Sequence, residues 1–274
     1  MNKNVKTCFE VVWYVIAFLL IQAVVQLLGA LAWALYSGQP FDVVSRGMMN
    51  GAYPTLLIVT MVVSGLLTIL LFALRKWSPV SRVFLRSRPW GVVFWTILLT
   101  LGMLLPMEWL YENLQIVMDD TTAALFNGIM REPLGYIAVG IVAPIAEEMV
   151  FRGAVLRVLL QLTGDKRHWI AIGISALLFA LVHGNVAQGV HATIAGLMLG
   201  WLYYRTNSIV PGIVMHWVNN SVAYVMYNLM PEMNDGKIID LFRGDDMMVY
   251  MALGFSLMIF LPSLFQLASR MKRN

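Results

Sequence analysis

Four groups of polar side chains interrupt long apolar stretches of this sequence, and any chemistry that the chain performs should be sought among them. They are the segment Glu147-Glu148-Met149-Val150-Phe151-Arg152, His183 four residues after Phe179, His191, and His216 four residues before Asn220. An ionisable side chain at the centre of a membrane span costs at least ~2.5–3.5 kcal/mol on insertion scales. Groups that bear such a cost are candidates for function.

The two adjacent glutamates are expected to differ in role. Glu148 and Arg152 are four residues apart and share one face of a helix, whereas Glu147 points about 100° away from them. We expect a Glu148–Arg152 ion pair that supports the structure, which leaves Glu147 for chemistry. Taken by itself, Glu147 could equally well pair with a polar neighbour and have no further role.

The histidines and Asn220 favour a shared functional site. At 1.5 Å per helical residue, Glu147, His183, His216 and Asn220 all lie roughly 12–22 Å from the helix ends on one side of the membrane. A lone buried histidine is more often a satisfied core residue than a catalyst. Two histidines, a glutamate and an asparagine at similar depth on three helices predict one common site.

Water activation is the chemistry that these groups permit. Glu147 can take a proton from water, a histidine can orient that water, and a His–Asn pair can donate hydrogen bonds to a developing oxyanion. Alternatively, Glu147, His183 and His216 could ligate a divalent metal such as zinc and leave a position open for water. Both routes end in hydrolysis. Ser175 and Ser221 are assigned no role, because serines in membrane helices usually bond carbonyls of their own helix.

The composition predicts the elements that must position these groups. Of the 274 residues, 59% are hydrophobic and 12% charged, and the mean hydropathy is +0.74, which excludes an ordinary soluble domain. Apolar stretches of about 20 residues are long enough to cross a bilayer as helices. We therefore predict an all-α, polytopic membrane helix bundle of about eight transmembrane helices. The candidate spans are 11–36, 53–74, 90–111, 134–160, 169–183, 186–204, 209–229 and 248–267. A tight turn is expected at Gly184-Asn185, between the fifth and sixth spans.

Basic residues predict the orientation of the bundle, because cytoplasmic loops retain Lys and Arg. If eight spans alternate, most of the Lys and Arg residues outside the spans fall on one side, and the acidic residues gather on the other. The basic groups are Lys3 and Lys6, the segments 75–88 and 157–167, Arg205, and the tail with Arg270, Lys272 and Arg273. We therefore place both termini in the cytoplasm. Topology and contact with anionic membrane lipids account for the net charge of +4, so no nucleic acid partner is expected.

In this order, Glu-Glu-x-x-x-Arg, Phe-x-x-x-His and His-x-x-x-Asn resemble the motifs of the CPBP intramembrane proteases, also called the Abi or type II CAAX prenyl endopeptidase family. The resemblance covers 134–230 as a catalytic core, with helices and loops of 1–133 before it and a loop, last span and tail over 231–274. It implies that Glu147 and His183 activate water, that His216 and Asn220 bind the oxyanion, and that Glu148 and Arg152 brace the site. The family has been described both as metalloproteases and as glutamate-type proteases. We favour the metal-free route, because Asn220 is a better hydrogen-bond donor than zinc ligand.

Substrate and localisation follow from the resemblance only in outline. It implies a membrane-associated protein or peptide substrate, prenylated for eukaryotic members, and the short chain resembles prokaryotic members of the cell membrane. His191, one turn after Gln188, is interpreted as an interhelical hydrogen bond rather than an additional ligand. Two other classes stay open: a proton-coupled transporter that uses the same buried polar cluster, and a non-catalytic membrane scaffold. The absence of an apparent inverted repeat counts against the transporter.

Overall fold

The computed structural model describes residues 3–79, 81–230 and 237–271, without the side chains of Lys3, Asn4 and Arg82. These residues form helices and the turns between them, and no strand occurs among them. The predicted all-α fold class is therefore confirmed. Lys272 and Arg273, which contribute to the predicted orientation, lie outside the described residues.

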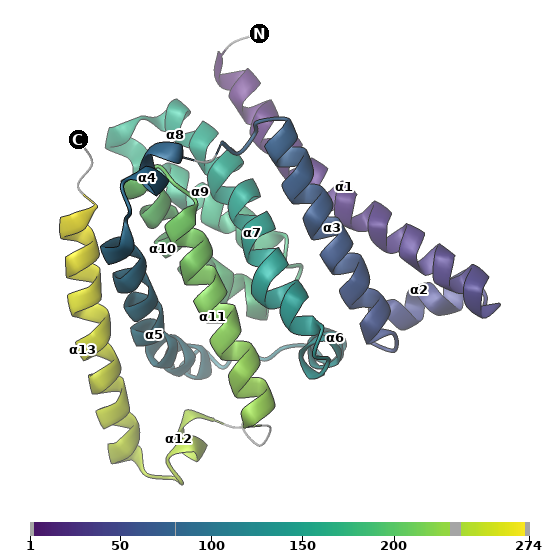
Figure 1. Cartoon of the computed structure of the whole chain (residues 1–274). Coiled ribbons are helices and arrows are strands. Elements are labelled where there is room, and N and C mark those ends of the chain that lie inside the picture. Colours follow the sequence, from purple (N-terminus) through teal and green to yellow (C-terminus); the bar gives the residue numbers. More distant parts are fainter. Residues whose placement is uncertain (1–2, 80, 231–236, 272–274) are drawn as a thin grey trace. The chain divides into compact units, whose positions relative to one another are not determined.

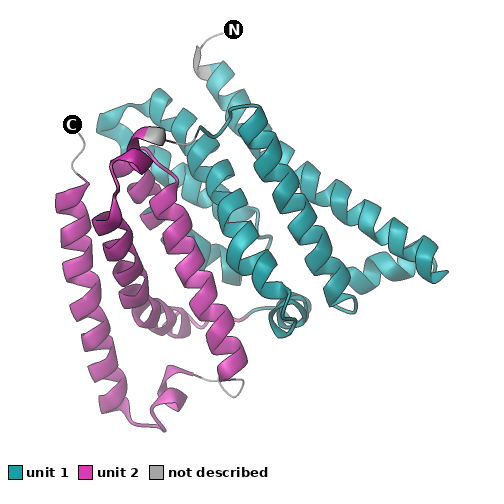
Figure 2. Ribbon diagram, in the orientation of Figure 1, with its two compact units in different colours: residues 1–79, 118–197 teal, residues 80–117, 198–274 magenta. Residues whose placement is uncertain are grey.

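The chain divides into two compact units, shown in separate colours in Figure 2. Unit 1 contains Met1–Pro79 and Met118–Leu197, and unit 2 contains Val80–Val117 and Met198–Asn274. The chain passes from unit 1 to unit 2 twice, first after Pro79 and then after Leu197, within helix α10 (Val186–Thr206). The segment 134–230, expected to carry the catalytic motifs, is thus shared between the two units.

The N-terminal part of unit 1 is a long helical hairpin with a short helix across its turn (Figure 1). Its elements are α1 (Lys3–Ser37), α2 (Phe41–Met49) and α3 (Pro54–Leu74). Small residues of α1, Ala30 and Ala34, contact Val44 and Met48 of α2, and these four side chains are buried together. The apolar face of α2 therefore packs against α1.

The rest of unit 1 holds the first two motifs. Its elements are α6 (Asp120–Arg131), η1 (Ile137–Val142), α7 (Ala143–Glu148), η2 (Met149–Leu156), α8 (Arg157–Thr163), η3 (Asp165–Arg167), α9 (His168–Leu181) and the start of α10. The predicted fourth span, 134–160, is helical but is not a uniform α-helix, because the π-helices η1 and η2 flank α7. Such π segments are rare and concentrate at functional sites.

Unit 2 holds the third motif. Its elements are α4 (Arg82–Arg86), α5 (Trp90–Asn113), the end of α10, α11 (Val210–Leu229), α12 (Ile238–Leu241) and α13 (Asp246–Arg270). Arg205 closes the end of α13, since its Nε donates to the Met271 carbonyl at 2.6 Å and its Nη2 to the Ala268 carbonyl at 2.7 Å. Carbonyls at a helix C-terminus lack partners within the helix, so this contact satisfies two of them.

Four described helices are long and apolar enough to cross a membrane: Val5–Ser37 within α1, Pro54–Leu74, Trp90–Asn113 and Asp246–Arg270. They correspond to the first, second, third and eighth predicted spans. The other four predicted spans are helical as well, and the total of eight stays a prediction. The protein is an all-α integral membrane protein.

Contact between α5 and α13 gives a test of the packing in unit 2. Ser256 Oγ donates to the Gly102 carbonyl at 3.1 Å, and a Cβ added at Gly102 would lie 2.6 Å from the Phe260 backbone nitrogen. We expect Gly102→Ala to push the two helices apart and cost about 1–3 kcal/mol of stability. Thermal unfolding of the purified chain in detergent measures this loss.

Gly254→Ala is the matched control, because a Cβ at this α13 glycine has nothing within 4 Å. Alanine is the better helix former, so this change should leave the unfolding temperature equal or slightly higher. Equal unfolding temperatures for the two variants would show that the α5–α13 contact is wrong.

Candidate functional site

The Glu148–Arg152 ion pair stands at the centre of the site in unit 1. Arg152 Nη1 donates to Glu148 Oε1 at 2.8 Å, and both side chains are 0% exposed. Glu148 is the last residue of α7 and Arg152 lies in η2. The predicted pair is therefore present, across the junction of an α-helical and a π-helical segment.

Two further groups contact the Arg152 guanidinium. Its Nη2 donates to the Gly196 carbonyl of α10 at 3.3 Å, and its Cζ lies 4.5 Å from the centre of the Phe179 ring of α9. A guanidinium over an aromatic face is attracted by the negative face of the ring. One cation thus connects η2 to α9 and α10.

Phe179 also positions His183, and this gives the Phe-x-x-x-His spacing a physical meaning. The two rings meet edge to face with their centres 4.9 Å apart. His183 Nδ1 lies 2.8 Å from the Phe179 carbonyl oxygen. A carbonyl oxygen only accepts hydrogen bonds, so Nδ1 is the protonated nitrogen and Nε2 carries the lone pair in the neutral ring.

The turn after His183 is held by Asn185. Gly184 has a φ of +72°, a conformation that glycine adopts without strain. Asn185 Oδ1 accepts from the Gln188 backbone N–H at 2.8 Å and caps α10, while its Nδ2 donates to the His183 carbonyl at 3.1 Å. The predicted tight turn is confirmed. The role of His191 stays a prediction.

Ser175 has a role that the sequence reasoning missed. Its Oγ donates at 2.9 Å to the carbonyl of Phe151 in η2, and not to its own helix. The expectation that Ser175 bonds a carbonyl of its own helix is therefore wrong, and its lack of a catalytic role stays a prediction. The spacing held a signal, since Ser175 lies four residues before Phe179 on one face of α9.

Glu147 differs from Glu148 in exposure. Glu147 is half-buried and Glu148 is fully buried. The charge of Glu147 also acts on Arg152, less strongly than that of Glu148. The two carboxylates thus occupy different environments, as expected, and the catalytic role of Glu147 stays a prediction.

His216 and Asn220 lie on α11 in unit 2, four residues apart on one helix. Asn219 Nδ2 donates to Asn220 Oδ1 at 3.1 Å, and His216 Nδ1 is shielded from solvent. Unit 1 brings together Glu148, Arg152 and His183. That His216 and Asn220 complete the same site stays a prediction.

The zinc alternative finds partial support in the donor set. Histidines that bind zinc usually donate their other nitrogen to a carbonyl or carboxylate, as His183 Nδ1 does. Neither unit, over its described residues, gathers three His, Cys, Asp or Glu side chains that could hold a metal ion. His183 suits one ligand position, and the zinc-binding set of Glu147, His183 and His216 stays a prediction.

The buried ion pair predicts a large effect of charge removal. Glu148→Gln should leave Arg152 as an uncompensated buried charge and cost about 3–5 kcal/mol of stability, measured as a fall in unfolding temperature and yield. The matched control is Asp42→Asn, because Asp42 and Arg46 also pair at a spacing of four but are 63% and 70% exposed. Removal of an exposed pair costs at most about 1 kcal/mol. Equal losses in the two variants would contradict the central role of the pair.

Comparisons with known proteins agree with the motifs. Residues 130–222 match the family described as "Type II CAAX prenyl endopeptidase Rce1-like". The chain is also 31% identical over 108 residues to "Putative membrane peptidase YdiL" of Bacillus subtilis (strain 168). That alignment covers 39% of this chain and 43% of the relative, so the chain spans less than half the length of the relative it matches.

No solved structure matches the chain. The three motifs lie in order inside the matched segment, so the predicted resemblance to the CPBP family is confirmed over residues 130–222.

Proposed function

We propose that this protein is an intramembrane endopeptidase that hydrolyses peptide bonds of membrane-associated or lipidated proteins or peptides. The observation that carries the proposal is the contact of buried Glu148, Arg152 and Phe179 with the half-buried His183, inside the segment that matches the family. The Phe179 carbonyl holds His183 in one tautomer, which suits a catalytic histidine better than a residue of a non-catalytic scaffold. The family match favours hydrolysis over transport.

The proposed mechanism divides the work between two pairs of residues. Glu147 accepts a proton from water, and the lone pair on His183 Nε2 orients that water or carries the second proton. His216 and Asn220 donate hydrogen bonds to the oxyanion that forms at the scissile carbonyl. The Asn219–Asn220 bond supports this role, because it fixes Oδ1 of Asn220 as the accepting end of the amide. Glu148 and Arg152 hold the helices that carry Glu147 and His183.

Membrane lipid is the medium of the reaction, and the substrate must reach the site from the bilayer or its surface. We propose a prokaryotic cell membrane as the location, because the short chain resembles prokaryotic members of the family. The basic residues between the predicted spans support a cytoplasmic position of both termini. The proposed orientation puts the basic segments 75–88 and 157–167 on the same side as the termini.

Glu147→Gln tests the proposed base. The amide is nearly isosteric but cannot accept the proton, so cleavage of a fluorogenic membrane-peptide library by the purified chain in liposomes should fall by about 10²–10⁴-fold. The unfolding temperature should stay close to that of the natural chain. The control is Glu108→Gln, a carboxylate near the end of α5, which should retain activity. Full activity of Glu147→Gln would remove Glu147 from the mechanism, and absence of cleavage by the folded natural chain would favour a transporter or scaffold.

Asn220→Ala separates the metal-free route from the zinc route. If Asn220 donates to an oxyanion, turnover should fall by about 10²–10³-fold while the metal content of the protein does not change. If Glu147, His183 and His216 instead hold zinc, His183→Ala should release a stoichiometric metal, and chelation should abolish activity until zinc is restored. Elemental analysis beside the activity assay distinguishes them. One tightly bound metal per active chain, lost and regained with activity, would overturn the metal-free route.

A further inference from the structure

An apolar groove runs between α1 and α3 in unit 1, on residues that the proposed reaction does not use. Its volume is about 550 Å³, and its walls come from 25–36 of α1 and 56–67 of α3. Leu28, Val59 and Val63 line it and are exposed. Thr60 also lines the groove, and its hydroxyl donates to the Leu57 carbonyl at 2.8 Å. An occupant of the groove therefore does not have to accept a hydrogen bond from this hydroxyl. The groove therefore offers contact to apolar atoms.

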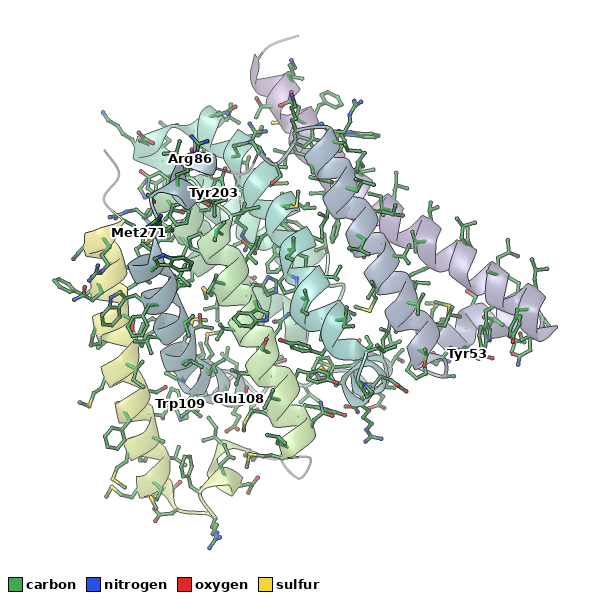
Figure 3. The ribbon with its side chains drawn as sticks, viewed as in Figure 1. Tyr53, Arg86, Glu108, Trp109, Tyr203 and Met271 are labelled. Atoms are coloured by element: carbon green, nitrogen blue, oxygen red, sulfur yellow. The ribbon has the colours of Figure 1, made fainter. Side chains whose placement is uncertain are left out.

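The end of the groove near α2 carries aromatic side chains with polar tips. Trp33 and Tyr36 line it there, and the Trp33 ring lies 6.3 Å from that of Tyr53, labelled in Figure 3. The Tyr53 hydroxyl donates to Gln39 Oε1 at 2.6 Å. Trp and Tyr gather where the hydrocarbon core of a bilayer meets its headgroups. This end of the groove thus fits the membrane interface.

The opposite half of the α1–α3 pair is closed by aromatic packing. Tyr14 of α1 lies with its ring centre 6.1 Å from that of Phe72 and 5.1 Å from that of Trp77. Phe18 meets Phe151 of η2 edge to face at 5.8 Å. The groove consequently follows only one half of the hairpin.

The length of the groove matches one leaflet of a bilayer. Val25 and Tyr36 are eleven residues apart on α1, which at 1.5 Å per residue is roughly 16 Å. Half of a hydrocarbon core of roughly 30 Å is ~15 Å. A transmembrane helix of a partner would need a groove along the whole span, whereas a lipid chain needs only the half that this groove provides.

We propose that the α1–α3 groove is a binding site for one acyl chain of a bilayer lipid from the leaflet on the α2 side. The headgroup lies at the level of Trp33, Tyr36 and Tyr53, and the chain descends between Val25 and Leu67 to the centre of the membrane. The volume falls in the range of about 300–1,000 Å³ that is usual for sites of small molecules.

The test uses the full chain in liposomes that contain a small fraction of phosphatidylcholine with a diazirine at the middle of one acyl chain. After irradiation, peptide mass spectrometry locates the attached lipid. We expect saturable labelling of 25–36 and 56–67, above that of Phe255 and Phe265, which are exposed on α13 and report ordinary lipid contact.

Ala32→Phe should fill the groove and lower its labelling by about tenfold, which corresponds to ~1.4 kcal/mol of binding free energy. Ala32 lines the groove and is exposed. Ala23 is exposed nine residues earlier, on the opposite face of α1, so Ala23→Phe is the matched control and should change nothing. Val63→Phe fills the groove from the other wall and replaces Ala32→Phe if that variant unfolds at a lower temperature.

Two results would overturn the proposal. Groove labelling that does not saturate and resists Ala32→Phe and Val63→Phe would show ordinary lipid contact only. A dimer of the chain, seen by native mass spectrometry and lost in the groove-filling variants, would show that a second copy covers the groove.

Discussion

The buried ion pair of Glu148 and Arg152 is the constraint on which the rest of unit 1 depends. Removal of two charges from water costs several kcal/mol for each ion, and their attraction repays this only with good geometry and further polar contacts. Here the further contacts are the Gly196 carbonyl and the Phe179 ring. Three elements, η2, α9 and α10, must therefore keep their places around one guanidinium. These contacts also fix the position of His183, because the Phe179 ring contacts both the Arg152 guanidinium and the His183 imidazole.

The π-helical turns carry a cost of their own. All eight residues of η2 are buried, so a backbone carbonyl without a partner there would be expensive. Ser175 reaches from α9 to the Phe151 carbonyl and satisfies it. Gly196 allows the close approach from the other side, since a Cβ at that position would lie 2.9 Å from the Ala176 Cβ and 3.3 Å from Arg152 Nη2. The distorted helix is thus accommodated by a small residue and a hydroxyl on its neighbours.

The proposed chemistry draws on both units. The proposed proton acceptor Glu147 and His183 belong to unit 1, and the proposed oxyanion donors His216 and Asn220 belong to unit 2. Helix α10 is continuous between them and contributes the Gly196 carbonyl to Arg152 in unit 1 and Arg205 to the end of α13 in unit 2. The same helix therefore takes part in the polar contacts that stabilise each unit. The α1–α3 groove shares no residue with the proposed catalytic set, so lipid binding in the groove and peptide hydrolysis can be measured separately.

The sequence by itself determined the features that depend on local geometry. Apolar stretches of membrane length specified helices, four-residue spacing specified the Glu148–Arg152 pair, and Gly184-Asn185 specified the turn between α9 and α10. Each rests on residues a few positions apart, whose relation within a helix or a turn is fixed by the backbone. The partners of Arg152 beyond Glu148, and the partner of Ser175, were decided by the tertiary structure. Gly196 is 44 positions from Arg152 and Phe151 is 24 positions from Ser175, and such contacts depend on how helices pack. The π segments beside α7 belong to the same class, because apolar periodicity does not distinguish a π turn from an α turn. Only the packed neighbours of η2 show what stabilises its wider turns.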